Sequence, residues 1–467
     1  MNLFHFLKSS DSKWHLLFLP FILFSCAKPE LISPTNTSPA VVSQTPLFVS
    51  KVTPFTIDFP GVDMGPNGMS QLVTECVSQT ILYSTKDGVE HLISNPYYKT
   101  PAPILHFIQK NGSWNLEGKY SEAAMDGFRN YDPVDADGSF VIANHGNEAI
   151  NPRPFGDLFV VKTIGEKLNW TKVSVGKSFY HSAAGGDLDG DGLFDISGIH
   201  MGTYTDWGEG PHLYKQNANA TFTSTRGFLD TTGFKGRNLG FGATLIADIL
   251  GDARNELMIA EYGFNTTFNK NFNERFGVAF FDYDKASGKL KYVTSLKELG
   301  IYSNPDRGTT SIKVADIDKD GDKDLLIAAE GSDSINLVQI FTNDGKGNFM
   351  PGQIISFNFN EFQFREFELV DINKDGYSDI LFHAFHLRFN QATLSDGFNL
   401  RNNVWINNKG IFEKYAKDIP IPTIRPGFIK GFYINGKVKF IGFGDPPTRT
   451  TAFSNTFDFY EITLNLF

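Results

Sequence analysis

Three stretches of the sequence place Asp or Asn at positions 1, 3, 5 and 9 of a nine-residue motif, with Gly at position 6. They span residues 187–195, 316–324 and 371–379. Oxygens at this spacing suit a hard cation such as Ca²⁺, and the Gly lets the chain turn sharply around the ion. Without a cation, carboxylates this close together disfavour one another's ionisation. The motifs therefore predict about three Ca²⁺ sites.

Side chains at positions 1, 3, 5 and 9 are the expected ligands, and position 7 contributes a backbone oxygen, which leaves its side chain free to vary. The predicted ligands are Asp187, Asp189, Asp191, Leu193, Asp195, Asp316, Asp318, Asp320, Asp322, Asp324, Asp371, Asn373, Asp375, Tyr377 and Asp379. The alternative is that these stretches are ordinary polar turns without an ion. A related stretch, 248–256, has Leu250 at position 3, and this loss of a ligand argues against a cation there.

The residues around each motif indicate strands. In an EF-hand, a helix and a bidentate Glu at position 12 would follow, but that position holds Gly198, Ile327 and Phe382. Short apolar runs follow instead, such as residues 325–329, and similar runs precede the motifs, such as residues 311–315. Further apolar stretches end in turns rich in Asn, Asp and Gly, which are typical of hairpins. Each unit therefore has four strands, as in a propeller blade.

The spacing of the units sets the number of blades. The motifs begin at Asp187, Asp316 and Asp371, a degenerate copy begins at Asp248, and a weaker one lies near Asp135. A unit without a motif passes through residues 431–441, and hairpin-like pieces fill residues 79–114. No stretch shows sustained helical periodicity. We predict an all-β propeller of seven four-stranded blades, with six or eight blades as alternatives.

These features resemble the FG-GAP/VCBS-type repeats of integrin-α-like β-propellers. The matching residues are the Asp motifs, Phe241-Gly-Ala, and the turns that end at Phe349 and Phe412. The resemblance covers roughly residues 75–467 as repeats. It implies the fold and calcium loops, but it does not imply one function, because such repeats serve adhesion, ligand binding and enzyme accessory domains alike.

The N-terminus carries a candidate export signal. Residues 16–24 form an apolar run that follows Lys8 and Lys13 and is too short to span a bilayer. The run leads into Leu-Phe-Ser-Cys26, which resembles a bacterial lipoprotein signal and implies lipidation of Cys26. The alternative is an ordinary signal peptide with a chance Cys. The absence of Asp after Cys26 points to the outer membrane or cell surface.

These observations predict a signal peptide over residues 1–25, a Ser/Thr/Pro-rich tether over 26–50 and the propeller over 51–467. Cys76 is expected to be a buried small residue, because lipidation or removal of Cys26 leaves it without a disulfide partner. The net charge of −10 reflects the Asp motifs, and no basic cluster indicates nucleic-acid binding.

The connections from the second to the third strand of each unit lie on the face opposite the Asp motifs. They are long, and long loops in a compact repeat are usually functional. Ionisable residues stand just past several second strands, and aromatic residues follow. The candidate ligand-face residues are His145, His200, Tyr204, Trp207, Glu261, Tyr262, Glu330, His383 and His386. The alternative is that strand ends simply turn polar where they meet solvent.

Three functions are compatible with this sequence. The first is a calcium-stabilised, membrane-anchored adhesion or binding protein that recognises a glycan or protein through its long loops. The second is a polysaccharide lyase or hydrolase on a propeller scaffold. The third is a structural subunit of an envelope complex. No common catalytic motif is visible, so an enzyme is the less favoured of these classes.

Overall fold

The computed structural model describes seventeen segments of the chain. They are residues 47–58, 80–94, 102–125, 128–135, 138–144, 156–174, 180–200, 211–225, 227–234, 240–262, 277–296, 308–330, 335–358, 363–385, 398–421, 426–444 and 456–466. The predicted signal peptide, Cys26, nearly all of the predicted tether, and Cys76 lie outside these segments.

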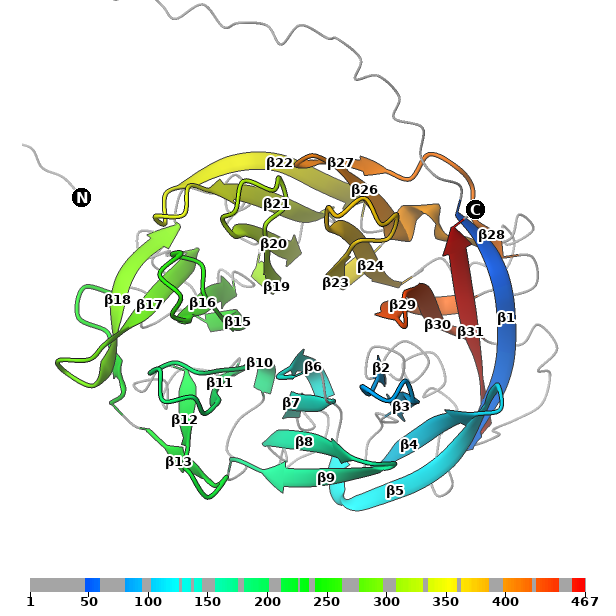
Figure 1. Cartoon of the computed structure of the whole chain (residues 1–467), viewed down its shortest axis with the longest axis horizontal. Helices are drawn as coiled ribbons and strands as arrows, with labels where there is room; N and C mark the ends of the chain where they lie inside the picture. Colours follow the sequence, from blue (N-terminus) through cyan, green and yellow to red (C-terminus); the bar gives the residue numbers. More distant parts are fainter. Residues whose placement is uncertain are drawn as a thin grey trace, which may run out of the picture. The chain divides into compact units, whose positions relative to one another are not determined.

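The described strands form seven antiparallel four-stranded blades around a common axis, which confirms the predicted fold (Figure 1). The first three blades contain β2 (Thr80–Ser84), β3 (Glu90–Ser94), β4 (Ala102–Lys110) and β5 (Ser113–Met125); β6 (Phe128–Pro133), β7 (Ser139–Asn144), β8 (Leu158–Ile164) and β9 (Lys167–Lys172); and β10 (Tyr180–Gly186), β11 (Asp195–His200), β12 (His212–Gln216) and β13 (Phe222–Ser224).

Blades four to six follow the same order from the axis outward. They contain β15 (Gly240–Ala247), β16 (Glu256–Tyr262), β17 (Val278–Asp284) and β18 (Lys289–Leu296); β19 (Gly308–Ala315), β20 (Asp324–Glu330), β21 (Ile335–Asn343) and β22 (Phe349–Asn358); and β23 (Gln363–Val370), β24 (Asp379–Phe385), β26 (Val404–Asn408) and β27 (Ile411–Lys414). Short pieces flank them: β14 (Leu229–Asp230), β25 (Phe398–Asn399), η6 (Leu400–Asn403) and β28 (Pro420–Ile421).

The seventh blade joins the two ends of the described chain. It contains β29 (Pro426–Ile434), β30 (Lys437–Gly444), β31 (Thr456–Leu466) and, as its outer strand, β1 (Leu47–Asp58). β1 pairs antiparallel with β31 from Leu47 opposite Leu466 to Asp58 opposite Thr456. β1 therefore includes the last four residues of the predicted tether, 47–50, and strand pairing closes the ring (Figure 1).

Packing between neighbouring blades explains the unbroken apolar runs in the sequence. In β20, Leu325 and Ile327 belong to a core shared with blade four, whereas Leu326 and Ala328 belong to a core shared with blade six. Successive side chains of a strand point to opposite faces of its sheet, and here a neighbouring blade covers each face of β20. A continuous apolar strand is thus what this position requires. Among the described residues, no helix is long and apolar enough to cross a membrane.

Candidate functional site

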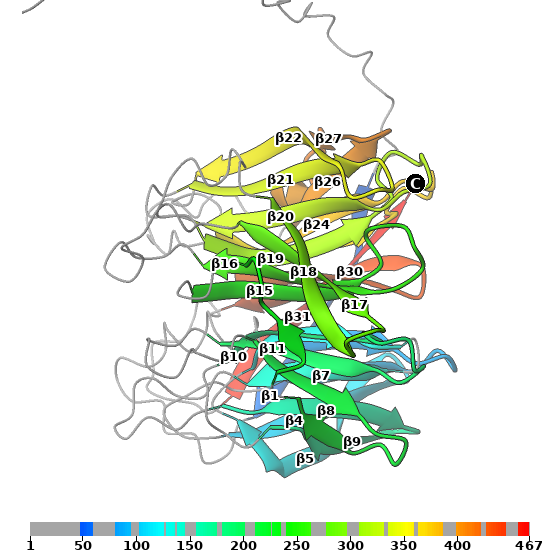
Figure 2. The same ribbon diagram turned by 90° about the vertical axis from the view of Figure 1, so that its left-hand side faces the viewer.

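The four Asp-rich loops each connect the first strand of a blade to the second. Loops 187–195, 248–256, 316–324 and 371–379 join β10 to β11, β15 to β16, β19 to β20, and β23 to β24. Because these strands start at equivalent positions around one ring, all four loops lie on one rim, which we call the Asp-loop rim (Figure 2). The second strands end at the other rim, here called the opposite rim.

The carboxylate at position 9 fastens each predicted cation loop to its blade. In Asp324, Oδ2 accepts a hydrogen bond from the backbone N–H of Ile317 at 2.9 Å, and Oδ1 accepts one from Asn343 in the third strand at 2.9 Å. Asp379 makes the same two bonds, to the N–H groups of Ile372 and Asn407. Burial raises the pKa of Asp324 to about 6 and of Asp379 to about 7. Position 9 therefore has a structural role in addition to its predicted role as a ligand.

The carboxylates of two loops fit a hard cation. Asp187, Asp189 and Asp195 bring ligand oxygens within 4.8 Å of one another, and so do Asp316, Asp318 and Asp320. Each cluster includes a buried oxygen without a hydrogen-bond partner, on Asp189 and on Asp316. A bound cation would satisfy both oxygens.

In loop 371–379, the described residues form no such cluster of three carboxylates. There Asn373 donates from Nδ2 to Asp375 at 2.9 Å, and the N–H of Tyr377 is bonded to the Asp375 carboxylate at 2.9 Å. The same position-7 bond occurs in the other predicted cation loops, from Leu193 to Asp191 and from Asp322 to Asp320. Position 7 thus donates its backbone N–H to the position-5 carboxylate, whereas its backbone oxygen as a cation ligand stays a prediction.

Asn side chains tie consecutive loops together across the blades. Nδ2 of Asn343 donates to the carbonyl oxygen of Ile249 at 2.7 Å, and Nδ2 of Asn407 donates to that of Ile317 at 2.7 Å. Nδ2 of Asn255 donates to the carbonyl oxygen of Asp187 at 3.0 Å. The loops of blades three to six therefore form one connected structural band on the Asp-loop rim.

A group of charged side chains lies on the inner strands, close to the propeller axis. We call Tyr131, Asp132, Lys313, Glu366, Glu368, His383 and Lys430 the axial cluster. Lys430 Nζ lies 3.6 Å from a Glu366 oxygen and 4.6 Å from the centroid of the Tyr131 ring, and Lys313 Nζ lies 3.5 Å from Glu368. Blades two, five, six and seven all contribute to it.

Burial and neighbouring charges shift the pKa values of the axial cluster in different directions. Burial raises the pKa of Asp132 to about 6, although a hydrogen bond from the Gly185 N–H opposes the rise. Burial also acts on Glu366, but Lys430 and His383 outweigh it and lower the pKa of Glu366 to about 2. His383 donates from Nε2 to the carbonyl oxygen of Gly431 at 2.9 Å, and burial lowers its pKa. At neutral pH, the cluster thus combines an ionised Glu366 with a neutral imidazole.

The predicted ligand-face residues do not form one ring. His200, Tyr262 and Glu330 end their second strands on the opposite rim, and Glu261 precedes Tyr262. Glu261 is fully buried and accepts a hydrogen bond from the Gly277 N–H, whereas His383 belongs to the axial cluster. The remaining candidates lie outside the described segments: His145, Tyr204, Trp207 and His386.

Sequence reasoning identified only His383 of the axial cluster. Tyr131 and Asp132 are adjacent in the mostly polar strand β6, whereas the other members are charged residues among apolar ones, such as Glu366 and Glu368 on either side of Phe367. This alternation places both carboxylates on the face opposite the Phe and was the available signal. Which blades meet at the axis depends on ring closure, which local patterns do not reveal.

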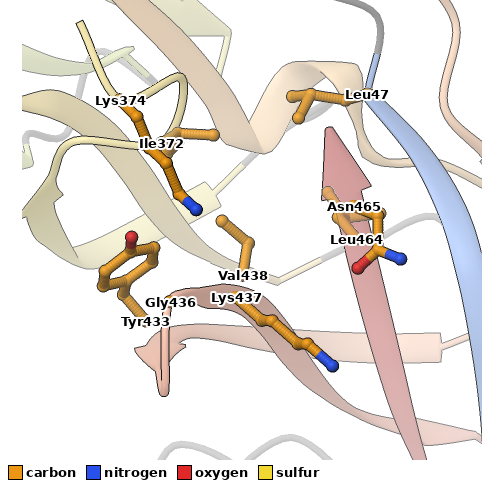
Figure 3. Close-up of a pocket in the computed structure, with 9 residues that line it drawn as sticks. All are labelled: Leu47, Ile372, Lys374, Tyr433, Gly436, Lys437, Val438, Leu464 and Asn465. Atoms are coloured by element: carbon orange, nitrogen blue, oxygen red, sulfur yellow. The ribbon is translucent and has the colours of Figure 1, made fainter. Parts of the chain in front are cut away.

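A pocket of about 210 Å³ lies on the Asp-loop rim between blades six and seven (Figure 3). Leu47, Val438 and Leu464 supply apolar walls, and Lys374 and Lys437 lie at its margin. The β29–β30 turn beside it has only two residues, Asn435 and Gly436, where blade six has its nine-residue Asp loop. The pocket therefore lies where the seventh blade has no Asp loop.

Comparison with known proteins supports the repeat type. Residues 316–382, from the Asp loop of blade five to β24 of blade six, match the model of the FG-GAP-like repeat. The search of curated protein sequences gave no match.

Several solved structures are similar over most of the chain. They are the periplasmic gluconolactonase PpgL of Pseudomonas aeruginosa (11% identity, TM-score 0.47, 77% of this chain and 93% of that one), the Dos1 propeller (10%, 0.42, 83% and 93%) and a protein from Lactobacillus plantarum (12%, 0.34, 74% and 97%). These likenesses are remote, so the propeller assignment is based on the strand pairing.

Proposed function

We propose that this seven-bladed β-propeller, which contains an FG-GAP-like repeat, is a calcium-stabilised extracytoplasmic binding or adhesion protein that recognises a glycan or another protein through its opposite rim. The observation that carries this proposal is that the loops of the Asp-loop rim are hydrogen-bonded to their own blades and to one another. This rim therefore supports the fold, and the opposite rim is left for recognition.

The calcium sites would be held by the ligands predicted in loops 187–195, 316–324 and 371–379. Bound Ca²⁺ would neutralise neighbouring carboxylates and stabilise the folded state by mass action. A lipid on Cys26 would anchor the protein to the cell envelope, at the outer membrane or cell surface, with the tether holding the propeller away from the bilayer.

A glycan and protein array, probed with and without EDTA, tests this proposal. We expect saturable binding and a higher melting temperature with Ca²⁺, with both reduced by chelation. Tyr262→Ala should weaken binding about tenfold or more, because an aromatic side chain at a recognition rim supplies much of the contact. Tyr433→Ala on the Asp-loop rim is the matched control and should bind as the wild type does. Equal binding by both variants would contradict the choice of rim, and insensitivity to EDTA would contradict the calcium sites.

The axial cluster favours a second candidate, an enzyme that acts on a polysaccharide. Asp132 and Glu366 belong to one cluster, with pKa values of about 6 and about 2. Carboxylates whose pKa values are held apart are the usual acid and base of glycan chemistry. This candidate predicts product release from a polysaccharide panel and a loss of roughly 100-fold or more in Asp132→Asn. Binding without turnover would exclude it, and co-purification with envelope proteins without a soluble ligand would favour the structural-subunit alternative.

A further inference from the structure

We propose that Arg254 serves as the built-in cation of loop 248–256, so that blade four keeps its loop closed without a metal ion. The loop occupies the same place in its blade as the three predicted cation loops, between the first and second strands. Asp248, Asp252 and Glu256 bring carboxylate oxygens within 4.8 Å of one another, as in two of those loops. The acidic cluster of blade four thus needs positive charge.

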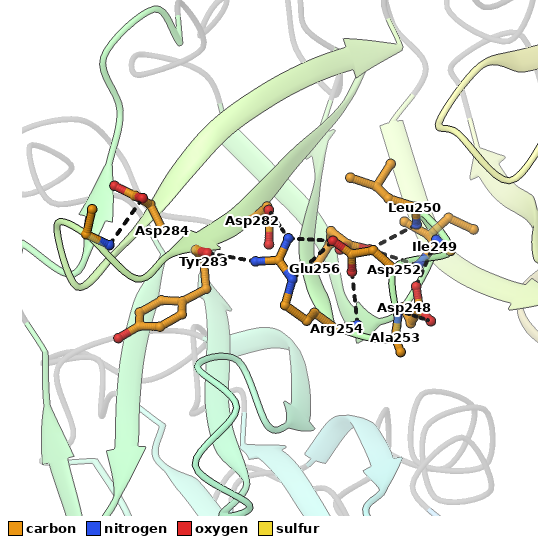
Figure 4. Close-up of polar contacts among 12 residues, drawn as sticks. Asp248, Ile249, Leu250, Asp252, Ala253, Arg254, Glu256, Asp282, Tyr283 and Asp284 are labelled. Carbon is orange, nitrogen blue, oxygen red and sulfur yellow. Dashed lines mark hydrogen bonds and ion pairs between the residues drawn. The ribbon is translucent and has the colours of Figure 1, made fainter.

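The guanidinium of Arg254, a side chain that is 40% exposed, supplies that charge through four contacts (Figure 4). Nε donates to Asp252 Oδ2 at 3.0 Å, and Nη2 pairs with the same carboxylate and with Asp282 Oδ2, the latter at 2.9 Å. Nη1 donates to the carbonyl oxygen of Tyr283 at 2.9 Å. The planar fork of Arg suits such an arrangement, and here it joins the loop to β17.

The rest of the loop is organised by its own backbone. Asp248 accepts hydrogen bonds from the N–H groups of Gly251 and Ala253, and Glu256 Oε2 accepts them from Ile249 and Leu250. Glu256 is fully buried, and its Oε1 has no hydrogen-bond partner. The loop therefore keeps most of the oxygen ligands that a cation would need. It lacks the ligand at position 3, where Leu250 stands, and Arg254 neutralises the carboxylate of Asp252.

The other loops differ in how they meet a positive charge. Loop 316–324 has acidic residues at positions 1, 3, 5, 7 and 9. One of its two basic residues, Lys319, contacts the carbonyl oxygen of Asp375 and the Tyr377 ring in blade six. In loop 187–195, Lys215 pairs with the predicted ligand Asp189, but Lys215 lies in the third strand, outside the loop, and the loop keeps oxygen-bearing side chains at positions 1, 3, 5 and 9. Loop 248–256 alone combines a lost ligand with an Arg at position 7.

Hydrogen exchange measured on the full chain in EDTA and in Ca²⁺ tests this inference, which concerns a loop outside the three sites of the proposed function. In the wild type, amides of loop 316–324 should exchange roughly tenfold faster in EDTA, whereas those of loop 248–256 should be unchanged. Arg254→Gln should accelerate exchange of loop 248–256 in EDTA by roughly tenfold, and Ca²⁺ should restore part of its protection. Arg254→Lys keeps the charge without the fork and should lie between the two.

Arg401→Gln is the matched control, because Arg401 forms an exposed pair with Asp418 far along the chain in blade six. It should leave loop 248–256 unchanged. The inference is overturned if Arg254→Gln exchanges like the wild type in EDTA, or if wild-type loop 248–256 responds to Ca²⁺ as loop 316–324 does. If no wild-type loop responds to Ca²⁺, the calcium part of the proposed function fails, and the comparison of Arg254→Gln with the wild type in EDTA still decides this inference.

Discussion

Lys439→Met is expected to lower the free energy of unfolding by about 3–5 kcal/mol. Lys439 lies in β30 of blade seven, and its ammonium contacts Glu90 Oε2 of blade one at 2.5 Å and Glu461 Oε1 of β31 at 2.9 Å. The side chains of Lys439, Glu90 and Glu461 are 7%, 10% and 4% exposed. Removing the cation would leave two carboxylates buried without their shared partner, and an uncompensated buried charge is costly.

The location of this group increases its importance. Blade one adds two further donors, since Trp114 Nε1 and Gln109 Nε2 reach Glu461 Oε2 at 2.9 Å and 3.0 Å. The contacts join the first and last blades, and β31, which carries Glu461, also pairs with β1 inside blade seven. The pairing of β1 with β31 and these contacts together hold the two ends of the described chain in the ring. Breaking the buried group is therefore expected to weaken the closure of the ring.

Unfolding in urea, followed by tryptophan fluorescence, measures the change. Lys110→Met is the matched control, because Lys110 forms an exposed pair with Glu166 at 2.8 Å and its loss should cost less than about 1 kcal/mol. Equal effects of the two substitutions would show that the buried group does not stabilise the closure. A milder effect in the triple variant Glu90→Gln, Lys439→Met, Glu461→Gln would identify the stranded charges as the cause.

The positions of the blades along the chain could be predicted from the sequence, because each blade carries its own local signals. Each Asp motif marks the first turn of a blade, and hairpin turns mark the outer strands, so blades one and seven were located without any motif. The degenerate copy at Asp248 also marks a real blade. In an outer strand such as β18, where buried and exposed residues alternate, a one-residue shift would move apolar side chains off the core face, so the pattern fixes the register of the strand.

The contacts that depend on ring closure were not visible in this way. β1 pairs with a strand about 400 residues away in the chain, and the sequence of β1 does not predict which strand that is. Lys439, Glu90 and Glu461 meet for the same reason, as do Asp132, Lys313 and the other axial residues. Arg254 was in view as position 7 of its loop, but its partner Asp282 lies in the third strand. Contacts between residues of different strands or blades could therefore not be predicted from the sequence.

Gly242→Ala is expected to cost about 3 kcal/mol, because the new methyl group overpacks the contact between two inner strands. Gly242 follows Phe241 in β15, at an irregularity in the pairing of β15 with β16. A Cβ at this position would lie 2.2 Å from the carbonyl oxygen of Thr309 in β19 and 3.3 Å from the Tyr262 ring. The first obstacle is backbone, so relief requires the inner strands of blades four and five to move apart.

Thermal and urea unfolding of Gly242→Ala, compared with Gly352→Ala, tests this explanation. Gly352 lies exposed in the outer strand β22, where a Cβ would lie 3.3 Å from the carbonyl oxygen of Ile340, a much smaller overlap than at Gly242, so Ala should cost less than about 1 kcal/mol there. Similar stability of the two variants would show that β15 and β19 adjust without cost.

The stability of Gly242→Ala also tests why Gly stands at the centre of the Phe-Gly-Ala sequence. Inner strands converge toward the axis, and small residues recur where they approach: a Cβ on Gly186 would lie 2.4 Å from Ile246, and one on Gly431 would lie 2.5 Å from Leu381. Gly242 is the strictest case, because it faces a carbonyl group that no rotamer change can move. Its neighbour Tyr262 is also the residue tested for recognition on the opposite rim. A Gly242→Ala variant that folds should therefore bind ligand more weakly as well, which links blade packing to the shape of that rim.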